Sequence, residues 1–92
     1  MKVNFYATLR QIIGQKTVEF DLRQGTTAAQ LVDTILERFP LMRPELIDEN
    51  GDLHSHIHIF INGRDVPFLE NKLDTVIEPT DKIDIFPPVG GG

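Results

Sequence analysis

The last six residues of the chain, PPVGGG at positions 87–92, could do chemistry through the backbone rather than through a side chain. Two consecutive prolines favour an extended path, and six extended residues span roughly 20 Å at about 3.3 Å per residue. Glycines have no Cβ, so this strip could enter a narrow channel and adopt almost any backbone angle. The group presented at its tip is then the α-carboxylate of Gly92, whose carbonyl carbon has no bulky neighbour.

A free carboxylate is a poor acylating group because it has no good leaving group. Joining it to AMP makes a mixed anhydride, from which a sulfur donor could form a thiocarboxylate and an amine could form an amide. We therefore expect a carrier whose reacting group is the carbonyl of Gly92, with Gly91 beside it. The chain contains no cysteine, so a thiocarboxylate would also explain how it could carry sulfur without a thiol.

Two other interpretations of the glycines are weaker. A phosphate-binding loop needs a helix directly after its glycines, and the sequence does not continue beyond Gly92. A frayed terminus is common in small domains, but here a strand leads directly into Pro87 and Pro88, which favours a directed exit. We therefore divide the chain into a folded domain, 1–86, and an extended, flexible tail, 87–92.

Three histidines, His54, His56 and His58, are spaced by two and would share one face of a strand. Imidazoles on one face could bind zinc or copper, but no carboxylate stands at a spacing that would orient them. We therefore expect a solvated strand face and no metal site. The acidic stretch 48–52, DENGD, lacks the glycine and glutamate spacing of an EF-hand loop and indicates a turn.

The composition limits the possible partners. The 92-residue chain is 40% hydrophobic and 25% charged, as expected for one globular domain. Its net charge of −5 disfavours nucleic acids and membrane surfaces, which are anionic, and suits a basic protein partner. The N-terminal segment is too short and too polar for a signal peptide or a membrane span, so we expect a cytoplasmic protein.

Hydrophobic periodicity predicts strands that alternate with one amphipathic helix. The helix, at 26–39, starts with a capping box of Thr27 and Gln30 and ends before Pro40. The predicted strands and the links between them are as follows: strands at 1–9, 16–22, 56–61 and 81–86; a short strand at 66–69; a turn or helical corner at 11–15; and a crossover with one helical turn at 73–77.

These elements indicate an α+β domain in which one main helix covers one face of a mixed sheet of four to five strands. Their order resembles the β-grasp fold of ubiquitin. That resemblance implies that the first and last strands pair in the centre of the sheet. Alternation places Ile83 and Ile85 inward, and Asp84 and Phe86 outward, and it also turns Phe60 outward.

Nearly the whole chain resembles the MoaD family, which supplies the small subunit of molybdopterin synthase. The stretches that carry the resemblance are KVNFYATLR, TTAAQLVDTILERFP, IFINGRDV and, most specific of all, the ending DKIDIFPPVGGG. Gly90 stands where the family often has a small polar residue. The segment 43–55 is longer than in the shortest members and resembles variants found in archaea and some bacteria.

The resemblance implies a sulfur carrier for molybdenum cofactor synthesis, which is not itself an enzyme and binds no cofactor. A ubiquitin-activating-like enzyme would use ATP to adenylate Gly92, which would then bear the thiocarboxylate. The carrier would next dock onto the large subunit of molybdopterin synthase. Phe86 matches the family aromatic that packs against partners, and the tail residues Pro87, Pro88, Val89 and Gly90 would dock with it. Alternation adds Phe60, either as part of this docking surface or as a lone exposed hydrophobic residue.

The sequence leaves the final acceptor open, because the same tail serves several reactions. The sulfur could instead go to tRNA thiolation, to thiazole synthesis or to a tungsten cofactor. An alternative from another class is a ubiquitin-like modifier that is joined to lysines of other proteins. A passive binding module with an incidental tail is a further possibility.

Overall fold

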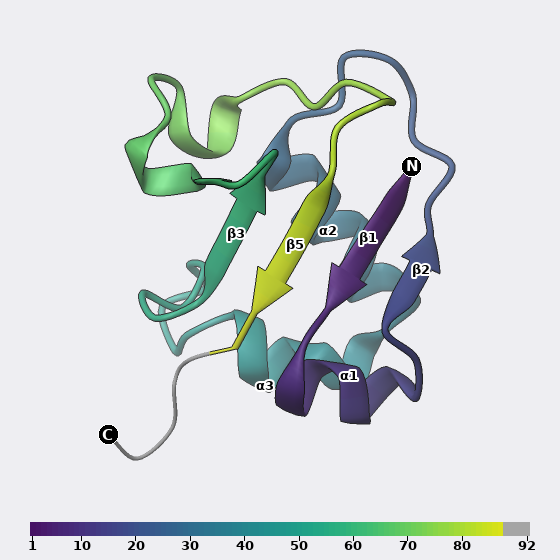
Figure 1. Ribbon diagram of the computed structural model, residues 1–92. Coiled ribbons are helices and arrows are strands. Elements are labelled where there is room, and N and C mark those ends of the chain that lie inside the picture. The colour runs from purple at the N-terminus through teal and green to yellow at the C-terminus, as the bar shows by residue number, and fades with distance from the viewer. Residues whose placement is uncertain (88–92) are drawn as a thin grey trace.

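The computed structural model describes residues 1–87 of the chain, which form a sheet, three α-helices and short 3₁₀ turns (Figure 1). The strands are β1 (Lys2–Phe5), β2 (Thr17–Glu19), β3 (His58–Ile61), β4 (Arg64–Asp65) and β5 (Ile83–Phe86). The helices are α1 (Ala7–Ile13), α2 (Ala28–Arg38) and α3 (Arg43–Leu46), and the 3₁₀ turns are η1 (Pro40–Met42), η2 (Val66–Phe68) and η3 (Lys72–Asp74).

The five strands form one mixed sheet in the order β2-β1-β5-β3-β4. The first and last strands, β1 and β5, pair in parallel at its centre, and Val3 lies opposite Ile83. The other pairs are antiparallel. This central pairing of the two chain ends confirms the β-grasp arrangement.

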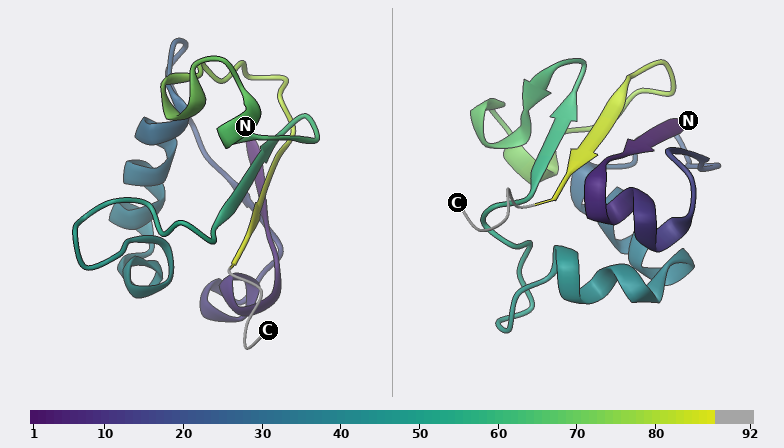
Figure 2. Two further views of the ribbon diagram at one scale, coloured as in Figure 1. Left: turned by 90° about the vertical axis from the view of Figure 1, so that its left-hand side faces the viewer. Right: turned by 60° about the horizontal axis from the view of Figure 1, so that its bottom comes forward.

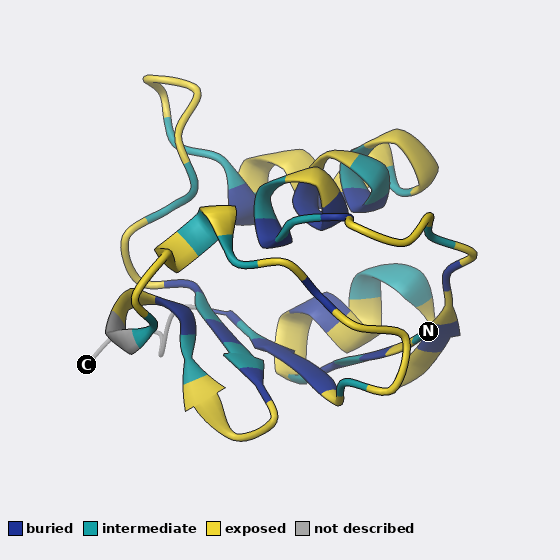
Figure 3. Cartoon of the chain, turned by 90° about the horizontal axis from the view of Figure 1, so that it is seen from above, coloured by how far each residue is buried: buried dark blue, intermediate teal, exposed yellow. Residues whose placement is uncertain are grey.

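Helix α2 covers one face of the sheet, as the side view shows (Figure 2). It begins with the expected capping box, in which Gln30 and Thr27 exchange hydrogen bonds, and the helix ends at Phe39, before Pro40. Residues coloured as buried lie on the facing sides of the helix and the sheet (Figure 3). They come from the centre of the sheet and from α2: Val3, Phe5, Ile59, Ile61, Ile83, Ile85, Ala28, Leu31, Val32 and Ile35.

The first predicted strand, 1–9, is too long. Strand β1 ends at Phe5, and Ala7 has a φ of +51°, so the chain turns out of the sheet and enters α1. Alternation placed Leu9 on a strand, but Leu9 lies on α1 and is fully buried in the core. The residues of α1 favour a helix, and Gly14 ends it in a left-handed conformation with φ +77°.

A second correction concerns the short strand predicted at 66–69. The fourth strand lies just before it, at Arg64–Asp65, and the segment that follows is the 3₁₀ turn η2. Pro67 explains the difference, because proline has no N–H to donate to a sheet ladder and suits the first turn of a helix. The helical turn expected in the crossover is present as η3, which starts at Lys72.

The longer segment, 43–55, contains α3 and a hairpin-like turn. Ile47 and Leu53 form an isolated antiparallel bridge across this turn. The Asp48 carboxylate accepts hydrogen bonds from the backbone N–H groups of Asn50 and Asp52, and Gly51 has a φ of +84°. The acidic stretch therefore forms a turn, as predicted. Among residues 1–87, no helix has the length and apolarity needed to cross a membrane.

Replacing Gly14 by Ala should destabilise the fold by about 1 kcal/mol, because an L-residue is strained in the left-handed region. An added Cβ would meet no atom within 4 Å, so backbone strain is the only expected cost. Chemical denaturation measures this difference, and Gln15→Ala, at the exposed next position, is the neutral control. Equal stability of the two variants would contradict the assigned cap.

Candidate functional site

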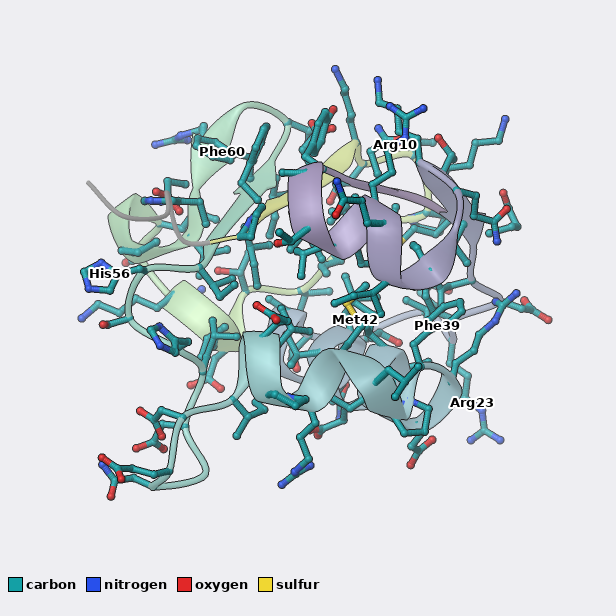
Figure 4. The ribbon with its side chains drawn as sticks, turned by 90° about the horizontal axis from the view of Figure 1, so that it is seen from below. Arg10, Arg23, Phe39, Met42, His56 and Phe60 are labelled. Carbon is teal, nitrogen blue, oxygen red and sulfur yellow. The ribbon has the colours of Figure 1, made fainter. Side chains whose placement is uncertain are left out.

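Two rows of side chains cross the outer face of the sheet, the face opposite α2. The first row joins residues that lie directly opposite one another on neighbouring strands: Thr17, Asn4, Asp84, Phe60 and Asp65. The second row includes Phe86, the last residue of β5, with His58 directly opposite it on β3. Figure 4 shows Phe60 on the side of the sheet away from the helices, whereas Met42 points into the interior.

Three aromatic rings pack together where β5 ends. Phe86 stacks on Tyr6 with ring centroids 4.2 Å apart and an interplanar angle of 9°. Phe60 meets Phe86 edge to face at 5.5 Å, a favourable geometry for aromatic pairs. The structure thus brings Phe60 and Phe86 together on the outer face, as the alternation and the ubiquitin-like sheet predicted. Both rings are half-buried rather than fully exposed.

These rings belong to a shallow groove, which we call the aromatic groove. Its lining residues are Tyr6, His58, Phe60, Gly63, Asp65, Lys82, Asp84 and Phe86. The groove lies at the root of the C-terminal tail because Phe86 is followed directly by Pro87, the last residue that the structure describes. Pro87 itself is buried. The predicted site residues Pro88, Val89, Gly90, Gly91 and Gly92 lie outside the described part of the chain.

Asp84 lies on the outer face, as alternation predicted, but it is almost fully buried, with 7% of its surface exposed. Its Oδ1 accepts hydrogen bonds from the Tyr6 hydroxyl at 2.7 Å and from the Asn4 amide at 3.0 Å. These bonds compensate the loss of water around the carboxylate. Asn4 in turn accepts a bond from the Thr17 hydroxyl, so a polar network supports the aromatic rings.

The same network affects the ionisation of Tyr6. The hydrogen bond that its hydroxyl donates to Asp84 raises the pKa of the phenol, and burial and the carboxylate charge add to this rise. The phenol therefore stays protonated at neutral pH and continues to donate to Asp84. This bond holds the Tyr6 ring in place against Phe86.

The three histidines do not share a strand face, contrary to our expectation. Only His58 lies on β3; His54 and His56 precede the strand, and their rings are 5.8 Å apart. His58 also has the carboxylate partner that the spacing seemed to lack, because its Nδ1 lies 2.8 Å from Oδ2 of Asp65. Within residues 1–87, no group of three or more His, Cys, Asp or Glu side chains could hold a metal ion.

The sequence interpretation missed Tyr6, His58, Asp65 and Asp84 as parts of the site. Alternation already placed Tyr6 and Asp84 on the polar face of their strands. However, they are 78 positions apart, and only the register of β1 against β5 brings them into contact. Asp65 was missed because the short strand was predicted at 66–69, whereas β4 lies at Arg64–Asp65.

Comparison with protein families gives a match over almost the whole chain. The model of the ThiS family matches residues 3–92. The chain is 28% identical to small archaeal modifier protein 3 of Haloferax volcanii. The alignment spans 92 residues, which are 100% of this chain and 98% of that protein. The chain is 31% identical over 80 residues to a putative sulfur carrier protein of Archaeoglobus fulgidus, covering 87% and 89% of the two chains.

Solved structures agree with these relatives. The crystal structure of SAMP1 from Haloferax volcanii superposes with a TM-score of 0.86 at 25% identity, over 99% of this chain and 97% of that one. A putative molybdopterin converting factor, subunit 1, from Pyrococcus furiosus superposes with a TM-score of 0.75 at 28% identity. The match covers 96% of this chain and 95% of that one. A chain of the BexX/CysO complex of Amycolatopsis orientalis superposes with a TM-score of 0.77 at 29% identity. The match covers 99% of this chain and 98% of that one. The chain therefore belongs to the ThiS family, whose members include ubiquitin-like sulfur carriers and modifiers.

Proposed function

We propose that this chain is a ubiquitin-like carrier whose working group is the carboxylate of Gly92. The observation that carries the proposal is the position of Phe86, which ends β5, lines the aromatic groove and directly precedes residues 87–92 in the sequence. Residues 87–92 continue directly from β5, the central strand, and the aromatic groove lies beside the end of that strand. The family match also extends through the final glycine. A partner that binds the groove would thus hold the root of the tail.

The proposed chemistry includes an activating partner, because a free carboxylate has no good leaving group. A carboxylate oxygen of Gly92 attacks the α-phosphorus of ATP on the partner, and pyrophosphate leaves. Hydrosulfide, as the sulfur donor, then attacks the carbonyl carbon and expels AMP, which leaves a thiocarboxylate and releases a proton. The carrier itself supplies the docking surface and the unhindered Gly91–Gly92 end, and it holds no cofactor of its own.

The aromatic groove suits the docking step. Aromatic residues are enriched among the residues that contribute most to protein–protein binding, and Phe60 and Phe86 are both partly accessible. The stack on Tyr6 and the support from Asp84 hold Phe86 in place before binding. Such preorganisation reduces the entropy lost when the partner binds. We propose that a ubiquitin-activating-like enzyme docks here.

The first candidate for the acceptor is a pterin precursor on the large subunit of molybdopterin synthase. Its support is the similarity to the putative molybdopterin converting factor subunit of Pyrococcus furiosus, which covers nearly all of both chains. In this role the carrier would be the small subunit and the co-substrate of the synthase, and the aromatic groove would also contact the large subunit.

The second candidate is a protein modifier joined through Gly92 to lysines, and the small archaeal modifier proteins support it at least as well. Trypsin cleaves after Lys82, so a modified lysine would retain the remnant IDIFPPVGGG. If the chain is a modifier, mass spectrometry of proteins from the native host should detect this remnant on foreign lysines. Its absence from a sample rich in this chain would rule out the modifier role.

Deleting Gly91 and Gly92 should abolish adenylation and leave the fold intact, because the described residues 1–87 already form a complete five-stranded sheet with its core. ATP–pyrophosphate exchange with the purified activating enzyme measures the first effect, and thermal unfolding measures the second. A variant that extends the tail by one alanine serves as a second test of the terminal group. Full exchange activity in the shortened chain would overturn the proposed function.

Replacing Phe86 by Ala should weaken binding of the activating enzyme at least tenfold, because a central aromatic anchor is lost. The cost in unfolding free energy should be smaller, about 1–2 kcal/mol, because the ring is only half-buried. Titration calorimetry measures the change in affinity, and chemical denaturation measures the change in unfolding free energy. Leu41→Ala removes a side chain that is 76% exposed on η1 and is the matched control. Unchanged affinity with a large loss of stability would show that Phe86 is a core residue only.

A further inference from the structure

We propose that the aromatic groove receives an arginine side chain from the activating partner, held between the Phe60 ring and the Asp65 carboxylate. This inference rests on the proposed function and specifies the chemistry of its docking step. Three features of the groove support it: the unused hydrogen-bond acceptors, the position of Phe60 between two carboxylates, and the weak pairing of the lysine beside them.

The groove contains acceptor atoms that lack donors. In the described part of the chain, Oδ1 of Asp65 is buried and has no hydrogen-bond partner, a costly state for a carboxylate oxygen. The other oxygen, Oδ2, contacts Nδ1 of His58. Since a carboxylate accepts, that Nδ1 carries the proton. A partner side chain must therefore bring donors.

Phe60 separates two carboxylates on the same face of the sheet. Asp84 lies directly opposite it on β5, and Asp65 lies directly opposite it on β4. The side chains of the two aspartates are 10% and 12% exposed, so both acids lie at the floor of the groove. An aromatic ring beside a carboxylate matches a guanidinium group, which is planar, stacks on rings and donates two hydrogen bonds to one carboxylate.

Basic groups of the chain itself do not fill this site. Nζ of Lys82 lies 3.9 Å from Oδ2 of Asp84, but the lysine side chain is 69% exposed, and such a pair contributes little. Lys16 lies over the Tyr6 ring, 5.1 Å from its centre, on the opposite side of Phe86 from His58. An incoming arginine can displace Lys82, whereas an acidic partner would meet two carboxylates and a net charge of −5.

The site also requires a small movement. Oδ1 of Asp65 is covered in the free chain, so the carboxylate must rotate toward the groove to meet a donor. Binding would then supply the missing hydrogen bond, and the free chain would keep an unsatisfied carboxylate that serves recognition rather than stability.

The test is the affinity of the full-length carrier for its purified activating enzyme, measured by titration calorimetry. Asp65→Asn should weaken binding about tenfold or more, because it removes a charged acceptor and presents an amide donor to the arginine. The unfolding midpoint should change little, because the Asn side-chain oxygen can still accept from Nδ1 of His58 and only Oδ1 of Asp65 has no partner to lose. Asp33→Asn, at an exposed position on α2, changes the net charge equally and should leave binding unchanged.

Lys82→Gln gives an independent test that does not depend on Asp65. If the partner brings an arginine, removing this lysine should leave binding unchanged or tighten it; if the partner brings an acid, binding should weaken. Phenylglyoxal labelling of the activating enzyme, with and without the carrier, should show one arginine that the wild-type carrier protects and the Asp65→Asn carrier does not.

Weaker binding by Lys82→Gln, an equal effect of Asp65→Asn and Asp33→Asn, or no protected arginine would each overturn the inference. Those results would leave the proposed function standing, provided that the wild-type chain is still adenylated. Failure of the wild-type chain to bind or to be adenylated would instead overturn the proposed function, and the arginine site with it.

Discussion

The structure depends on the parallel pairing of β1 with β5 in the middle of the sheet. This pairing joins the two ends of the chain, setting Val3 against Ile83 and Phe5 against Ile85, with all four side chains buried. The same register brings Asn4 and Tyr6 to Asp84 on the opposite face. The backbone hydrogen bonds between β1 and β5 thus position the core residues on one face and the aromatic groove on the other. They also hold in place the strand that precedes the tail in the sequence.

The two faces of the central strands have different roles. The inner face stabilises the fold, and we propose that the outer face binds partners. The inner face is hydrophobic and buried against α2 and other parts of the core, so changes there would act on folding. The outer face carries rings that are only half-buried and carboxylates that are nearly buried. Two diagonal contacts, Tyr6 with Asp84 and His58 with Asp65, hold these groups across neighbouring strands. A small domain can tolerate such polar groups because its aliphatic core lies on the other face.

Much of the fold could be predicted from local pattern. The alternation around Ile59 and Ile83, the capping box at Thr27 and the stop at Pro40 each rest on neighbouring residues, and the structure confirms all three. The predicted strand at 1–9 was wrong, because its alternating pattern continues through residues that form α1. Periodicity cannot show a turn at Ala7, where one residue adopts a positive φ.

The candidate site was less predictable than the fold. Alternation predicted that Phe60 and Phe86 face outward, but it could not supply their neighbours. The contacts of Tyr6 with Asp84 and of His58 with Asp65 depend on strand register, which the sequence of a single strand does not contain. The role proposed for Gly92 still rests on the chemistry of its terminal carboxylate and on the family match.

The most direct test of the central claim is the mass of the C-terminal tryptic peptide, residues 83–92, from protein isolated from its native host. The account predicts a fraction in which sulfur replaces one oxygen at Gly92, or in which Gly92 is joined to an amine. That fraction should increase when the acceptor pathway is blocked. A peptide that carries only the free carboxylate under all these conditions would contradict the claim that the chain acts through its terminal carboxylate.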